Sequence, residues 1–189
     1  MQSKYVDKFK IDIDIDGIYE ESVTFRFGDD PAICVWVSND GEEPISALLE
    51  SFEVFKYHGH SEFVLYDLCI GHKTKCTLSS HPDGVRLDIE HFNGEWERYA
   101  VNTRRWSYTM PLSVYKEAIV GTALNALKRY GCKGISESWH VIGGTYFLGR
   151  LVSLLYPEDC ERVDTKDDNY LCRSDIKKEL QTIIDALEE

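Results

Sequence analysis

A change of hydrophobic period between residues 8 and 55 constrains the fold of this chain most. From Lys8 to Ile15, polar and apolar residues alternate strictly, as in a strand with one buried and one solvated face. From Pro44 onward, the apolar residues recur at helical spacing instead. The apolar members of this second pattern are Ile45, Leu48, Leu49, Phe52 and Phe55. A chain that uses both periods builds a sheet and covers it with helices.

The rest of the chain extends this pattern in the order strands, helix, strands, helices. Further strands are predicted at 22–27, 32–38, 62–68, 75–80, 85–92 and 95–101, with a tight turn at 81–84. Helices are predicted from Pro44 to before Gly59, from Pro111 to Gly131, at 141–156, and after a capping Ser174. The sequence therefore predicts an α+β fold, with a largely antiparallel sheet, helices packed on one face and a C-terminal helix.

The length of 189 residues favours one domain. We expect an α+β domain at 1–157, with an acidic loop and an amphipathic helix at 158–189 packed on it. We also expect Cys34, between Ile33 and Val35, to be a small core residue, and Trp36 to lie in or beside the core. The N-terminal residues lack a secretory signal and no apolar run reaches the length of a membrane span, so we expect a cytoplasmic protein.

Negative charge is concentrated at the two ends of the chain. The net charge of −12 divides into −7 for residues 1–43, +1 for 44–157 and −6 for 158–189. Such a surface repels nucleic-acid phosphates and anionic membranes and attracts basic partners. The sequence therefore predicts a basic protein partner and argues against binding to nucleic acid or membrane.

Asp12, Asp14 and Asp16 resemble the start of an EF-hand calcium loop. Position 12 of that loop would be Val23 in place of the required Glu, and the flanking residues alternate as in strands. We therefore interpret these aspartates as a row on the wet face of a strand. Such a row suits a partner's Lys or Arg, or protects a sheet edge from mispairing.

A group of histidines and cysteines between residues 58 and 91 suggests a metal site as an alternative. Cys69, His72, Cys76 and His81 are of the types that zinc accepts, although their spacing matches no common zinc motif. We find neither a nucleophile elbow nor a phosphate-binding glycine loop in the sequence. The sequence thus predicts no catalytic residue and no cofactor, and leaves enzyme activity open but disfavoured.

Three stretches carry a resemblance to a known group of proteins. They are Glu43–Phe52, Ser61–Leu65 and Asp83–Ile89, followed by a helix that ends near Gly131. Their order resembles small acidic bacterial proteins, some of them immunity proteins of polymorphic toxin systems. The resemblance covers roughly residues 30–131, transfers no functional residue, and implies a bacterial binding protein.

These observations lead to one main hypothesis and two alternatives. The main hypothesis is a non-catalytic interaction protein, in its most concrete form an immunity protein that neutralises a basic toxin domain. One alternative is a small metal-dependent hydrolase or metal-binding domain, and the other is a structural subunit whose tail helix enters an oligomer interface. The oligomeric state stays open. The predicted partner-binding residues are Asp12, Asp14, Asp16, Asp29, Asp30, Glu42 and Glu43.

Overall fold

The computed structural model describes residues 2–15, 21–37, 44–67, 71–93, 103–139, 155 and 175–188. The chain divides into two compact units, Met1–Thr122 and Ala123–Glu189. The first unit contains a five-stranded and a three-stranded sheet, and the second contains the C-terminal helix. This content confirms the predicted α+β class.

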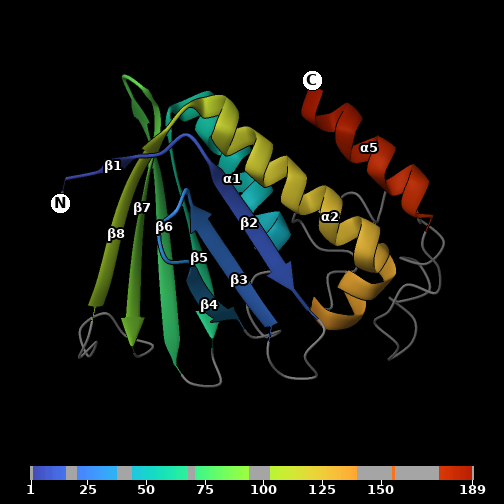
Figure 1. The fold of residues 1–189 in the computed structure, drawn as a ribbon. Helices are drawn as coiled ribbons and strands as arrows, with labels where there is room; N and C mark the ends of the chain where they lie inside the picture. The colour runs from blue at the N-terminus through green and yellow to red at the C-terminus, as the bar shows by residue number, and fades with distance from the viewer. Residues whose placement is uncertain are drawn as a thin grey trace. The chain divides into compact units, whose positions relative to one another are not determined.

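The five-stranded sheet has the order β1-β8-β7-β6-β5. Its strands are β1 (Lys4–Tyr5), β5 (His60–Asp67), β6 (His72–His81), β7 (Gly84–Asn93) and β8 (Thr103–Met110). Strands β5 to β8 pair antiparallel and lie side by side in Figure 1, whereas β1 pairs parallel with β8. The predicted turn at 81–84 joins β6 to β7, and Gly84 is required there because a Cβ would collide with the carbonyl oxygen of Met110.

Strand β8 was not predicted from the sequence. Its first half contains the exposed Arg104 and Arg105, and its second half is buried without alternation, so the strand lacks the period-2 pattern. The predicted strand at 95–101 and nearly all of the predicted helix at 141–156 lie outside the described residues.

The three-stranded sheet has the order β2-β3-β4 and is antiparallel throughout. Its strands are β2 (Phe9–Asp14), β3 (Glu21–Phe27) and β4 (Ile33–Val37). Odd-numbered residues such as Phe25 and Val35 are buried, and even-numbered residues of β2 and β4 are exposed. The predictions for Cys34 and Trp36 were therefore wrong, because Ile33, Val35 and Val37 take the buried face of β4 and turn both residues to solvent.

Aromatic rings join the buried sides of the two sheets. Phe27 of β3 stacks on Tyr108 of β8 with 3.7 Å between ring centroids, and Phe9 of β2 stacks on Phe27 at 4.7 Å. Phe9 also stacks on Tyr115, a fully buried residue of α2 (Leu112–Trp139), at 5.9 Å. The first unit therefore has one core that both sheets share.

Helix α1 (Pro44–His58) completes this core. The five apolar residues predicted from its helical spacing are all buried, and the helix contacts β5 and β6. Gly59 follows the helix with φ of 68°, and its N–H donates to the carbonyl of Phe55, which is the predicted helix stop.

The predicted helix end at Gly131 coincides with a kink inside α2. Gly131 adopts φ of 65°, as expected of a terminating glycine, but the chain resumes a helical course and runs to Trp139. In the first unit, the hydroxyl of Thr122 donates to the carbonyl of Ile11 at 2.8 Å, which satisfies a backbone acceptor of β2.

In the second unit, helix α5 (Ile176–Glu188) is capped by Asp175, whose Oδ1 accepts the backbone N–H of Lys178 at 3.2 Å. The predicted cap, Ser174, lies one residue too early and outside the described residues. Glu179 of α5 is fully buried, and its Oε2 accepts the N–H of Cys132 at 2.9 Å. This carboxylate therefore bonds to the residue just after the Gly131 kink.

Candidate interaction surface

The structure describes four of the seven predicted partner-binding residues: Asp12, Asp14, Asp29 and Asp30. Asp16, Glu42 and Glu43 lie outside the described residues. The four divide between two ends of the three-stranded sheet. Asp14 is the last residue of β2, whereas Asp29 and Asp30 follow the far end of β3, roughly 17 Å away along the strands. They therefore form no single acidic patch.

Asp30 is held by the protein's own residues. Its carboxylate pairs with the ammonium of Lys4 and accepts a hydrogen bond from the Tyr108 hydroxyl at 3.3 Å. The hydrogen bond from Lys4 lowers the pKa of Asp30 below its ordinary value of 3.8. Burial, and then the nearby charge of Asp30, raise the pKa of Tyr108. These contacts tie the turn after β3 to β1 and β8, which is a structural role.

Asp12 also has an intramolecular partner, but an exposed one. Arg26 Nε lies 2.8 Å from Asp12 Oδ2, and the two side chains are 54% and 62% exposed. In the strand register, Arg26 faces Lys10, a like charge, and reaches diagonally to Asp12. Ion pairs this exposed contribute roughly 0–1 kcal/mol, so a partner's cation could replace Arg26 at little cost.

The outer face of the three-stranded sheet carries an exposed indole at the Asp14 end. Trp36 is 48% exposed and is aligned in register with Ser22 of β3, which is aligned in turn with Asp14 of β2. We call this set, with Asp12, Thr24 and Cys34 from the neighbouring register row, the Trp36 face. Its members come from all three strands, and the residues between Trp36 and the aspartates are small.

Sequence reasoning missed Trp36 as a surface residue. The alternation in β4 could have predicted this orientation. Ile33, Val35 and Val37 are β-branched residues on alternate positions, which indicates that their side of the strand is buried and the Trp36 side is exposed. The general tendency of Trp and Cys to be buried outweighed this local signal.

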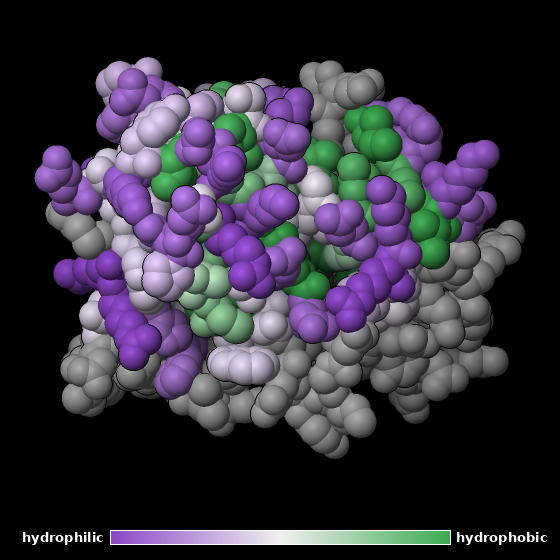
Figure 2. All heavy atoms as spheres, in the orientation of Figure 1, coloured by the Kyte–Doolittle hydropathy of each residue, from purple (hydrophilic) through white to green (hydrophobic). Residues whose placement is uncertain are grey.

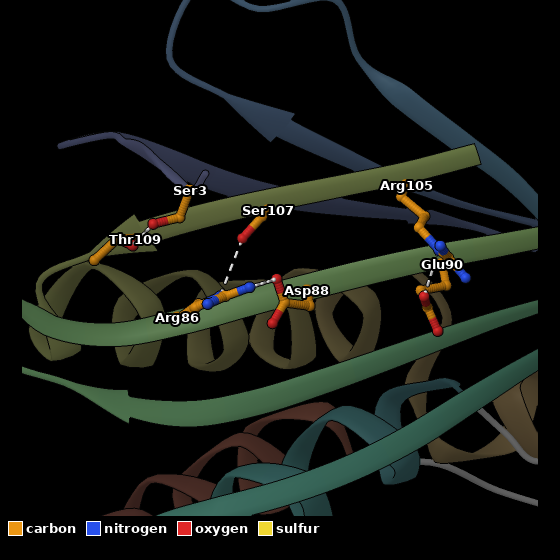
Figure 3. Close-up of polar contacts among 7 residues, drawn as sticks. All are labelled: Ser3, Arg86, Asp88, Glu90, Arg105, Ser107 and Thr109. Atoms are coloured by element: carbon orange, nitrogen blue, oxygen red, sulfur yellow. Dashed lines mark hydrogen bonds and ion pairs between the residues drawn. The ribbon is translucent and has the colours of Figure 1, made fainter. Parts of the chain in front are cut away.

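The outer face of the five-stranded sheet is also charged, but its charges pair with one another (Figure 3). Arg105 of β8 contacts Glu90 of β7 at 2.7 Å, and Lys75 of β6 contacts Glu62 of β5 at 2.9 Å. The hydrogen bond from Lys75 lowers the pKa of Glu62. This face is therefore largely neutralised from within.

The same face holds a half-buried arginine. Arg86 lies 2.9 Å from Asp88, and its Nε donates to Ser107 Oγ at 3.1 Å. Beside them, the Thr109 hydroxyl donates to Ser3 at 2.8 Å and fastens the segment before β1 to β8 (Figure 3).

The predicted metal site is wrong as a single site. His72, Cys76 and His81 all lie on β6, and the strand rise separates the two histidines by about 30 Å. Cys76 is fully buried, and burial raises the pKa of its thiol. Cys69 lies outside the described residues, and the part of the chain that the structure describes holds no group of three metal-ligating side chains.

A histidine pair on the inner side of β6 and β7 is the remaining group of chemical interest. His91 Nδ1 lies 2.9 Å from the Thr74 hydroxyl, and the rings of His91 and His72 meet edge to face at 5.3 Å. Thr74 is only 2% exposed, so its hydroxyl cannot meet a substrate from solvent in this arrangement. We interpret the pair as satisfying buried polar groups.

Helix α5 presents some apolar surface of its own. Ile176 is 38% exposed, and Figure 2 shows hydrophobic side chains at the surface over this helix. Among the described residues, no helix is both long and apolar enough to cross a bilayer.

No family model, curated protein or solved structure matches the chain.

Proposed function

We propose that the protein is a non-catalytic interaction protein that captures a basic protein partner at the Asp14 end of its three-stranded sheet. In its most concrete form, it is a bacterial immunity protein that neutralises a basic toxin domain in the cytoplasm. Long-range attraction would steer the partner to this end, and surface contacts would then occlude it without any chemistry on it.

The observation that carries the proposal is the polarity of this sheet. Antiparallel pairing places the end of β2, the start of β3 and the end of β4 at one end of the sheet. The segments 15–20 and 38–43, which adjoin these strand ends in sequence, contain five carboxylates and no Lys or Arg. Those carboxylates are Asp16, Glu20, Asp40, Glu42 and Glu43.

The described residues show the same separation of acidic and basic side chains between the two ends of the sheet. Asp14 is the terminal residue of β2 at the same end, whereas Lys8 and Lys10 lie toward the other end, near the turn that contains Asp29. Like charges gathered at one end reinforce one another's potential, and this raises the encounter rate with a cationic surface. Of the predicted partner-binding residues, Asp30 at the other end pairs with Lys4, and Asp12 in the Trp36 face pairs with the exposed Arg26.

The test is the salt dependence of binding. We would measure by calorimetry the affinity of the purified chain for the proteins encoded beside its gene, and for a nine-residue arginine peptide as a generic basic probe. We expect affinity to fall about tenfold or more between 50 and 300 mM NaCl. Binding that is indifferent to salt, or no binding to any of these, would contradict the proposal.

A further inference from the structure

Trp36 is the most conspicuous side chain of the Trp36 face. Tryptophan buries most of its large surface on average in folded proteins. Trp36, the second-last residue of the regular strand β4, nevertheless keeps 48% of its surface exposed. Burial of such a side chain by a partner contributes strongly to affinity, and Trp is enriched among the residues that dominate binding energy. The sheet gains nothing evident from exposing it, which points to a partner.

The surroundings of Trp36 define the chemistry of that partner. Asp14 lies two strands away in the same register row, about 10 Å from Trp36 between backbones, with Ser22 between them. The next row repeats the arrangement with Asp12, Thr24 and Cys34. An indole on one side, carboxylates on the other and small side chains between them suit a flat cationic group that lies across the strands.

We propose that the Trp36 face binds an arginine-bearing segment of the basic partner, with an arginine guanidinium stacked on Trp36 and paired with Asp12 or Asp14. This inference deepens the proposed function and depends on it. Arginine fits better than lysine because its planar group stacks on aromatic rings and bonds carboxylates through two parallel N–H groups.

Two observations support this occupant. Arg26 already shows that a guanidinium can bond Asp12 on this face, through its Nε at 2.8 Å. That pair is more than half exposed, so a partner's arginine could exchange with it at little cost. A second copy of the chain fits less well, because each copy has a net charge of −12 and the two would repel.

The experiment compares Trp36→Ala and Trp36→Phe with wild type in calorimetric titrations with nine-residue arginine and lysine peptides at 50 mM NaCl. Tyr57→Ala is the matched control, because Tyr57 is an aromatic residue of α1 that is 77% exposed. We expect Trp36→Ala to weaken arginine-peptide binding about three- to tenfold, Trp36→Phe to weaken it less, and Tyr57→Ala to leave it within about twofold. The lysine peptide should lose less than the arginine peptide in Trp36→Ala.

The outcomes separate this inference from the proposed function. If wild type binds neither peptide, both fail. If wild type binds in a salt-sensitive manner and Trp36→Ala and Trp36→Phe bind equally well, the inference fails and the proposed function stands. Equal losses in Trp36→Ala and Tyr57→Ala would also overturn the inference. Sedimentation that shows a wild-type dimer and a monomeric Trp36→Ala would assign the face to a second copy instead.

Discussion

The outer faces of the two sheets differ in how their charged side chains are paired. On the five-stranded sheet, Arg105 meets Glu90 and Arg86 meets Asp88, so opposite charges are matched within the face. On the three-stranded sheet, the Asp12–Arg26 pair is more than half exposed, and Trp36 is exposed in the same register row as Asp14. The first arrangement stabilises its own sheet, whereas the second exposes an ion pair and an indole to solvent. This difference is the reason that we place the proposed binding site on the three-stranded sheet.

The largest expected loss of stability comes from a substitution in the core that the two sheets share. Phe27→Ala removes a fully buried ring that stacks on Phe9 and Tyr108. We expect a loss of about 3–5 kcal/mol in the free energy of unfolding, measured by urea denaturation. A loss below about 1 kcal/mol would mean that the two sheets do not share a core.

A smaller effect should distinguish the ion pairs of the two outer faces. Asp88→Asn removes the negative charge beside the half-buried Arg86 and leaves it only neutral acceptors, so we expect a loss of about 1–2 kcal/mol. Asp12→Asn breaks an exposed pair and should cost less than about 0.5 kcal/mol. Equal losses in urea denaturation would contradict the contrast between the faces.

The fall in stability at acid pH should depend on the ionised Asp30 carboxylate. Its pKa is lowered in the folded state, so its stabilising contribution is present above its ordinary value of 3.8 and is lost as pH falls below that value. Asp30→Asn should therefore flatten the fall in melting temperature at acid pH. Asp29→Asn, which removes the neighbouring carboxylate in the same turn, is the control. Parallel profiles for wild type and Asp30→Asn would contradict this assignment.

The smallest expected change in stability comes from a substitution on the exposed side of β4. Cys34→Ser should change the free energy of unfolding by less than about 0.5 kcal/mol, because the side chain lies in solvent. Cys76→Ser places a hydroxyl at a fully buried site and should cost about 1–3 kcal/mol. Comparable losses in the two variants would mean that the outward orientation of Cys34 and Trp36 is wrong.

Much of the fold could be predicted because its signals are local. The alternation in β2, the spacing in α1 and the turn at 81–84 each depend on neighbouring residues, and the structure confirms all three. Strand β8 was missed because two arginines precede its buried half. Gly131 was predicted to end a helix; it adopts a non-helical conformation with positive φ, and a second helical stretch follows it.

The candidate site was harder to predict, because it depends on which strands become neighbours. Sequence shows where carboxylates occur, but not that Arg26 and Lys4 pair with Asp12 and Asp30. Nor does it show that Asp14 and Trp36 share a register row through Ser22. The metal hypothesis failed for a related reason, since residues close in sequence become distant once they occupy one extended strand.

The most direct test of the account compares charge reversal at the two ends of the three-stranded sheet. Asp14→Lys and Asp29→Lys make the same change in net charge, but only the first lies in the Trp36 face. Calorimetry at 50 mM NaCl with the nine-residue arginine peptide should show at least about a fivefold loss of affinity for Asp14→Lys and less than about a twofold loss for Asp29→Lys. Equal losses, or a larger loss for Asp29→Lys, would contradict the assignment of the partner to the Asp14 end.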